Sequence, residues 1–135
     1  MSRRAVTAED LAVHLGTSTS AVHGWLASRR VPEPPVLLAL ARALRLRPAD
    51  LTLIDEAQER LADLRIHAGL LQAAAAEAAG LRQPQLSKME RGVSVPKPEL
   101  CQGLARAYGV PEERVLAAWK RSRRDRQRHA AARLA

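Results

Sequence analysis

The chain of 135 residues has almost no aromatic side chains, because it contains no Phe, one Tyr and two Trp. Its apolar positions are filled by Leu, Ala and Val, which suit close-packed helices better than a sheet. Its single cysteine, Cys101, excludes an internal disulfide and a cysteine-rich metal site. We therefore expect an all-α fold in which the Cys101 thiol is buried.

Long apolar runs are also missing, since none approaches the roughly 20 residues that span a bilayer. No signal-type apolar stretch follows Arg4. The four histidines lack Cys or acidic neighbours at metal-ligand spacing, and no Gly-rich phosphate loop or nucleophile–base arrangement is present. The sequence therefore predicts a cytoplasmic protein that is not an enzyme and that uses no metal, cofactor, small-molecule ligand or membrane.

Acidic residues are scarce at the C-terminal end, so the net charge of +8 is unevenly distributed. Residues 1–54 carry a net charge of +3, residues 55–119 carry −1 and residues 120–135 carry +6. A basic tail of this kind is typical of proteins that bind a polyanion, most often nucleic acid. A solvated, partly disordered end is the alternative.

The two halves of the chain share a pattern when one is shifted by 64 residues. The matches fall on small, apolar and turn positions, which a fold must keep. Because this period exceeds that of solenoid repeats, we predict two domains rather than an array. The expected boundaries are 1–54 and 55–119 for the domains and 120–135 for a basic helical tail. The matched pairs are Ala12/Ala76, Gly16/Gly80, Val31/Val95, Pro32/Pro96, Pro34/Pro98, Leu40/Leu104, Ala41/Ala105, Arg42/Arg106 and Ala43/Ala107.

Start and stop signals divide both halves into short helices. Thr7 and Asp10 form a capping box, Gly16 ends that helix, and Ser18 caps the next one. The inner stripe of this second helix is Ala21, Val22, Trp25 and Leu26. Three prolines within residues 32–35 predict a loop over residues 29–35. Further helices are expected over residues 36–46, from Pro48, and over 55–68, 72–79, 83–91, 98–108 and 111–119. The last is expected to extend through Lys120–Arg128 and to fray over residues 129–135.

Each half contains two short helices joined by a tight turn, which is a helix-turn-helix arrangement. Ala12 and Ala76 let the helices cross closely, while Gly16 and Gly80 make the turns. Val22 and Leu86 anchor the second helix to the core. The exposed residues near the start of that helix are then free to read base edges in a major groove.

The second half, about residues 58–118, resembles the Cro/lambda-repressor type of helix-turn-helix domain. The resemblance rests on the segments 61–70, 79–81, 86–92, 96–100 and 104–110. It implies five helices, the third of which enters the major groove. It assigns Gln72 to a phosphate, and Gln83, Gln85, Ser87, Lys88 and Arg91 to the DNA-contacting helix and its end. Leu71 and Arg82 replace the usual capping residues, and Pro84 removes a side chain that often reads bases.

The first half resembles the same family over residues 7–54 but lacks the first helix. Arg29 and Arg30 are placed for phosphates, as Arg121, Arg123 and Arg124 of the tail are. The residues that map onto the cap and the exposed reading face are Ser18, Thr19, Ser20, His23 and Gly24. Residues 6–32 also resemble an excisionase-type winged helix, which would need a β-wing after Pro32. The helical pattern of residues 36–46 favours the repressor type.

These expectations converge on a sequence-specific, bacterial or phage transcriptional regulator that binds double-stranded DNA in the nucleoid. Repressors of this type are commonly dimers, which favours a homodimer. One alternative gives DNA binding to one half and dimerisation to the other. Another is an adaptor-like or antitoxin-like protein that holds a protein partner.

Overall fold

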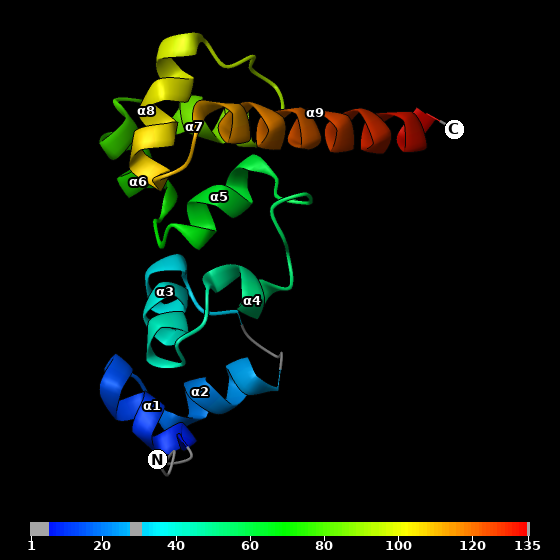
Figure 1. Cartoon of the computed structure of the whole chain (residues 1–135). Coiled ribbons are helices and arrows are strands. Elements are labelled where there is room, and N and C mark those ends of the chain that lie inside the picture. The colour runs from blue at the N-terminus through cyan, green and yellow to red at the C-terminus, as the bar shows by residue number, and fades with distance from the viewer. Residues whose placement is uncertain (1–5, 28–30, 135) are drawn as a thin grey trace.

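A computed structural model describes residues 6–27 and 31–134, and all the regular structure in these ranges is helical (Figure 1). The expectation of an all-α fold is therefore confirmed. The helices are α1 (Ala8–Leu15), α2 (Thr19–Leu26), α3 (Pro34–Ala43), α4 (Pro48–Thr52), α5 (Leu61–His67), α6 (Gln72–Ala79), α7 (Gln83–Glu90), α8 (Pro98–Tyr108) and α9 (Glu112–Leu134). No helix in the described part of the chain is long and apolar enough to cross a membrane.

Local capping signals set the ends of α1 and α2. The Thr7 hydroxyl accepts a hydrogen bond from the Asp10 amide, and the Asp10 carboxylate accepts one from the Thr7 amide, each at 3.1 Å. Gly16 then ends α1 in the left-handed conformation, with φ of 66°. The Ser18 hydroxyl accepts from the Ala21 amide at 3.1 Å. All three predicted capping features are confirmed.

The core of the first half is small, consisting of Leu11, Ala12, Val22 and Leu40. The inner stripe predicted for α2 is wrong at Leu26, which is 63% exposed. Gly24, which we expected on the reading face, is buried instead. Because Gly24 has no side chain that could extend beyond the neighbouring residues, these residues cover its backbone.

The loop predicted over residues 29–35 is wrong at its C-terminal end, because α3 begins at Pro34. Pro34 and Pro35 occupy the first turn of α3, where an absent N–H costs no helical hydrogen bond. The helix ends at Ala43, and Arg45 adopts a positive φ of 56°. Leu37, Leu40 and Ala41 are buried on its inner face.

The helix expected over residues 55–68 is shorter than predicted, since α5 begins only at Leu61. Its start is set by Asp63, whose carboxylate accepts from the Arg60 amide at 2.8 Å. Residues before it form a turn in which Asp55 accepts from the Ala57 amide at 3.0 Å. This turn delivers Glu59 to the interior, where it is 1% exposed.

The second half has a larger core, built from α5–α9 around Leu61, Leu86, Leu104 and Val115. Cys101 lies in this core, as predicted, and burial raises the pKa of its thiol, with a smaller contribution from Glu112.

The last helix, α9, runs past the body of the second half (Figure 1). Its buried residues end at Ser122, whose hydroxyl accepts from the Leu61 amide at 3.0 Å and donates to the Ala118 carbonyl at 3.2 Å. The extension of the last helix by the tail is confirmed, but the predicted fraying is not found through Leu134. Ala and Arg are strong helix formers, which accounts for the continued helix.

The central helix α5 joins the halves, because it packs on α7 and α9 and also on α3 and α4. Gly69 follows it with a φ of 77°, and a Cβ built there would lie 2.8 Å from the Leu38 Cβ on α3. The Thr52 hydroxyl lies 2.8 Å from His67 Nε2, so α4 and α5 are also linked by a hydrogen bond.

We predict that Gly69→Ala destabilises the protein more than Gly109→Ala. Both glycines have positive φ, but no atom lies within 4 Å of a Cβ at Gly109. Gly109→Ala should cost about 1 kcal/mol from backbone strain, and Gly69→Ala about 1–3 kcal/mol more from the clash with Leu38. Urea unfolding measures both. Equal losses would contradict the α3–α5 packing, and Leu38→Ala should partly rescue Gly69→Ala.

We also predict that the Cys101 thiol of the native protein reacts slowly. Because the thiolate is the reactive form, burial and a raised pKa both reduce its rate. Reaction with a disulfide reagent at pH 8 should be at least about tenfold slower in the native protein than in urea. A native rate equal to the unfolded rate would place Cys101 outside the core.

Candidate nucleic-acid interface

Helix α7 presents a polar face and buries an apolar one. Leu86 and Met89 point into the core, and Gln83, Lys88 and Arg91 are exposed. Pro84 lies in the first turn, as expected. Gln85 is already used as a cap, because its side-chain oxygen accepts from the Arg82 amide at 2.9 Å. Ser87 is half-buried, and its carbonyl accepts from Arg91 Nε at 3.3 Å.

A buried ion pair holds this helix against α5. Arg65 donates from Nε and Nη2 to the Glu90 carboxylate at 2.7 and 3.2 Å, and from Nη1 to the Leu70 carbonyl at 3.1 Å. The bidentate geometry fixes both side chains, since a planar guanidinium matches a carboxylate. The Arg65 and Glu90 side chains are mostly buried, at 14% and 7% exposure. The end of α7 is therefore held by a partner 25 residues earlier in the chain.

The same carboxylate orients two residues predicted to contact DNA. Gln72 Nε2 at the start of α6 donates to Glu90 at 3.0 Å, and Gln83 Nε2 donates to Gln72 Oε1 at 3.3 Å. The structure thus brings Gln72 and Gln83 together at the N-terminal ends of α6 and α7. Sequence reasoning did not identify Arg65, because nothing local to it signals a partner in α7.

Tyr108 lies close to this network in a dry environment. Burial raises the pKa of its phenol, as does the Glu90 carboxylate, and Arg65 opposes this in part. Its hydroxyl has no hydrogen-bond partner among the described residues. The phenol therefore stays neutral and contributes packing. No group of three or more His, Cys, Asp or Glu within the described ranges is arranged to hold a metal.

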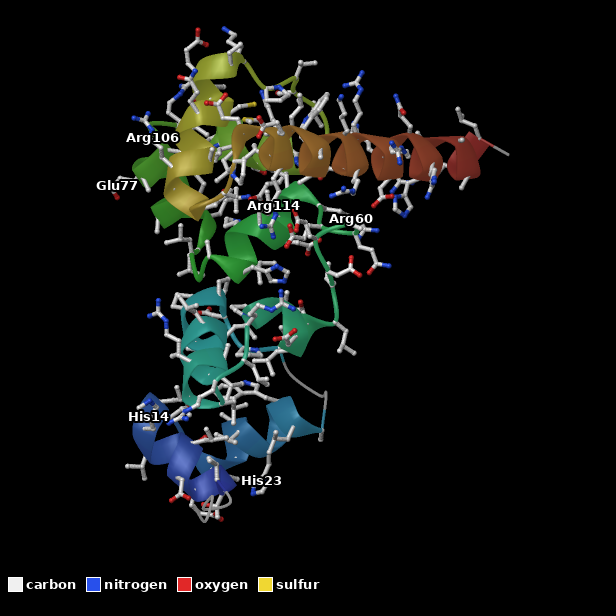
Figure 2. All side chains as sticks on the ribbon, viewed as in Figure 1. His14, His23, Arg60, Glu77, Arg106 and Arg114 are labelled. Atoms are coloured by element: carbon white, nitrogen blue, oxygen red, sulfur yellow. The ribbon has the colours of Figure 1, made fainter. Side chains whose placement is uncertain are left out.

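The α1–turn–α2 segment repeats this geometry with fewer polar groups. Ser20 and His23 are exposed on α2, and Figure 2 shows His23 pointing away from the body. Thr19 is half-buried, and the Ser18 hydroxyl is engaged as the cap. The predicted phosphate contacts Arg29 and Arg30 lie outside the described residues.

Family comparisons agree with this geometry in both halves. A model described as a helix-turn-helix domain matches residues 1–53, and a second described as helix-turn-helix matches residues 61–115. The chain therefore consists of two tandem helix-turn-helix domains. The second is of the Cro/lambda-repressor type, as the sequence predicted. No curated protein matches the chain. Helix-turn-helix domains indicate a DNA-binding regulator.

The basic tail that follows the second helix-turn-helix domain does not present its arginines uniformly. Arg121 donates from Nη1 to the carbonyls of Glu56 and Glu59, at 3.1 and 2.9 Å. The Arg123 guanidinium lies over the Trp119 ring, 5.6 Å from its centroid. Arg124 is exposed. Of the three predicted tail contacts, two are therefore engaged with the body of the domain.

We predict that Glu90→Ala destabilises the second domain by about 3 kcal/mol, because it leaves the mostly buried Arg65 without its partner. Glu77→Ala is the control, since Glu77 is exposed and lies on the neighbouring α6. Chemical denaturation followed by circular dichroism measures both. The double variant R65M/E90L should lose less than Glu90→Ala alone. A neutral Glu90→Ala would show that the ion pair does not hold α7.

Proposed function

We propose that the protein is a sequence-specific transcriptional regulator whose α7 reads base edges in the major groove. The observation that carries this is the polar face of Gln83, Lys88 and Arg91, held in place by the Arg65–Glu90–Gln72 network. A preorganised helix and a preorganised Gln83 amide favour recognition because ordering them costs no further entropy on binding. Gln72, at the N-terminal end of α6, suits a phosphate contact.

The two domains contribute unequally to this proposed readout. In α2 the position equivalent to Lys88 is Gly24, which has no side chain and is buried. The position equivalent to Glu90 is Leu26, which is exposed. The first domain therefore offers Ser20 and His23 to a groove, with Arg29 and Arg30 expected at phosphates. We assign it the weaker part of a bipartite site.

A second candidate is that the first domain contacts protein, either another copy or a different partner. The apolar side chains of Val13, Leu26 and Val31 are exposed on it. Contiguous exposed apolar patches are typical of interaction sites, and this candidate requires the three side chains to form one. This would leave DNA reading to the second domain, and light scattering would detect a homodimer directly.

Selection of random duplex DNA by the full-length protein tests the proposal, at low and near-physiological salt. We expect one recovered motif, with affinity that falls steeply as salt rises. Recovery of no motif, with binding lost at higher salt, would refute sequence-specific reading.

Two matched variants then separate the domains on the recovered site. Q83A/K88A should weaken binding by roughly 10- to 100-fold and erase the corresponding part of the motif. S20A/H23A should have a smaller effect on a separate part, and Glu77→Ala should have none. Equal affinity of Q83A/K88A and the unaltered protein would remove α7 from the interface.

A further inference from the structure

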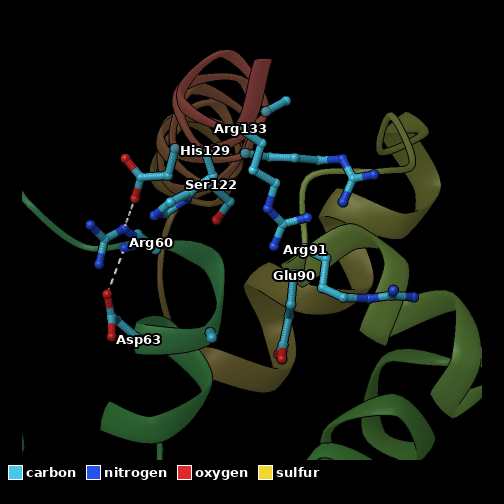
Figure 3. Close-up of a pocket in the computed structure, with 11 residues that line it drawn as sticks. Arg60, Asp63, Glu90, Arg91, Ser122, His129 and Arg133 are labelled. Carbon is cyan, nitrogen blue, oxygen red and sulfur yellow. Dashed lines mark hydrogen bonds and ion pairs between the residues drawn. The ribbon is translucent and has the colours of Figure 1, made fainter. Parts of the chain in front are cut away.

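A groove of about 730 Å³ lies between the C-terminal end of α7 and the projecting half of α9 (Figure 3). The start of α5 contributes Arg60 and Asp63 to it, α7 contributes Glu90, and Arg91 follows at the end of α7. Residues Ser122, Arg126, His129 and Arg133 line it from α9 at spacings of four, three and four residues. That spacing is one face of a helix, so the groove follows α9 outward.

Acidic and basic groups are separated within this groove. On one side, Arg60 pairs with Asp125, and the Arg60 amide donates to the Asp63 carboxylate (Figure 3). Glu90 is satisfied by Arg65. On the other side, no described carboxylate forms an ion pair with Arg91, Arg126 or Arg133. The lining has four arginines and three carboxylates, and one of these carboxylates is paired with Arg65 from outside the groove, so the groove has a surplus of positive charge.

The walls of the groove are fixed to the proposed reading helix. Gly92 follows the α7 cap residue Arg91, and a Cβ at Gly92 would lie 2.7 Å from the Arg123 Cα, so the α9 backbone crosses in contact with the end of α7. The hydrogen bond from the Leu61 amide to Ser122 holds the same turn of α9 to α5. The backbone positions from which Arg91 and the α9 arginines project are therefore fixed relative to α7.

We infer that this groove binds the sugar–phosphate backbone of the same duplex, flanking the base pairs that α7 reads. The inference rests on the proposed function and names Arg91, Arg126 and Arg133 as phosphate contacts in place of Arg121 and Arg123. From Ser122 to Leu134 the helix extends about 18 Å. Measured along the duplex axis, where each strand has one phosphate per 3.4 Å, that length corresponds to about five phosphates.

A long polyanion fits these features better than a small anion does. The basic positions are spread along the helix, and the groove is open, so no enclosed pocket surrounds a single phosphate. It is also continuous with Arg91 at the end of α7, where the backbone next to a major-groove helix passes. Binding here would extend the contacted length of DNA beyond the bases read by α7.

The double variant R126Q/R133Q tests the inference on the selected DNA site, with K120Q/R128Q as its matched control. Lys120 and Arg128 lie on the same helix and are exposed, but they do not line the groove. R126Q/R133Q should weaken binding at least about tenfold near physiological salt and lower the slope of log affinity against log salt by about two. The control should change affinity less than about threefold, because its basic residues lie outside the groove.

Hydroxyl-radical footprinting supplies the second readout. Protection of several sugars beside the α7 motif should disappear with R126Q/R133Q and persist with K120Q/R128Q. If the unaltered protein selects a motif but both double variants weaken binding equally, or leave the flanking protection unchanged, the inference is wrong while the proposed function stands. The inference is also wrong if single-stranded RNA competes for the flanking contacts as well as duplex DNA does. Failure of the unaltered protein to select any motif refutes the proposed function instead.

Discussion

The buried carboxylate of Glu59 is the point on which the arrangement of both domains depends. Arg114 on α9 donates to it twice, at 2.7 and 3.0 Å, and His67 on α5 lies 3.3 Å from it. His67 in turn contacts Thr52 on α4. A carboxylate removed from water is costly unless charged or polar partners replace the water. The hydrogen bonds to Glu59 raise the pKa of Arg114, so this guanidinium remains charged.

This constraint explains why α5 serves two domains. The second domain uses α5 as its first helix. The first domain lacks an equivalent first helix, and its α3 and α4 pack on the other side of α5. The consequence is visible at Leu26, which occupies the place of Glu90 when the halves are aligned. Glu90 has Arg65 on α5 as a partner, and the described part of the first domain offers no equivalent helix. An apolar residue is tolerated at this position, and it stays exposed.

The sequence predicted features that depend on neighbouring residues. The Thr7–Asp10 box, the glycine stops and the bounds of α6 follow from local signals, because a cap involves residues within one turn. Helix α5 was predicted to begin at residue 55 although Asp63 caps it locally, because the turn before α5 depends on burying Glu59 against Arg114, 55 residues later. The Arg65–Glu90 pair and the burial of Gly24 were missed for the same reason, since tertiary contacts decide them. The tail arginines show both the local and the tertiary case. The helix that carries them was predicted from helix propensity, but the sequence did not predict which of them contact the rest of the domain.

Some arginines of α9 contact the protein and others face solvent, so the net charge of the tail is not all available to bind DNA. Arg121 is used to hold the turn before α5, and Arg123 covers Trp119, so neither contributes charge that is fully available to DNA. Counting every basic residue from 120 to 135 therefore overstates the phosphate contacts. The spacing of Ser122, Arg126, His129 and Arg133 places the arginines that line the groove on one face of α9. The first residue of this set, Ser122, ties α9 to α5. The packing that positions the helix thus also selects which arginines face the duplex in the proposed complex.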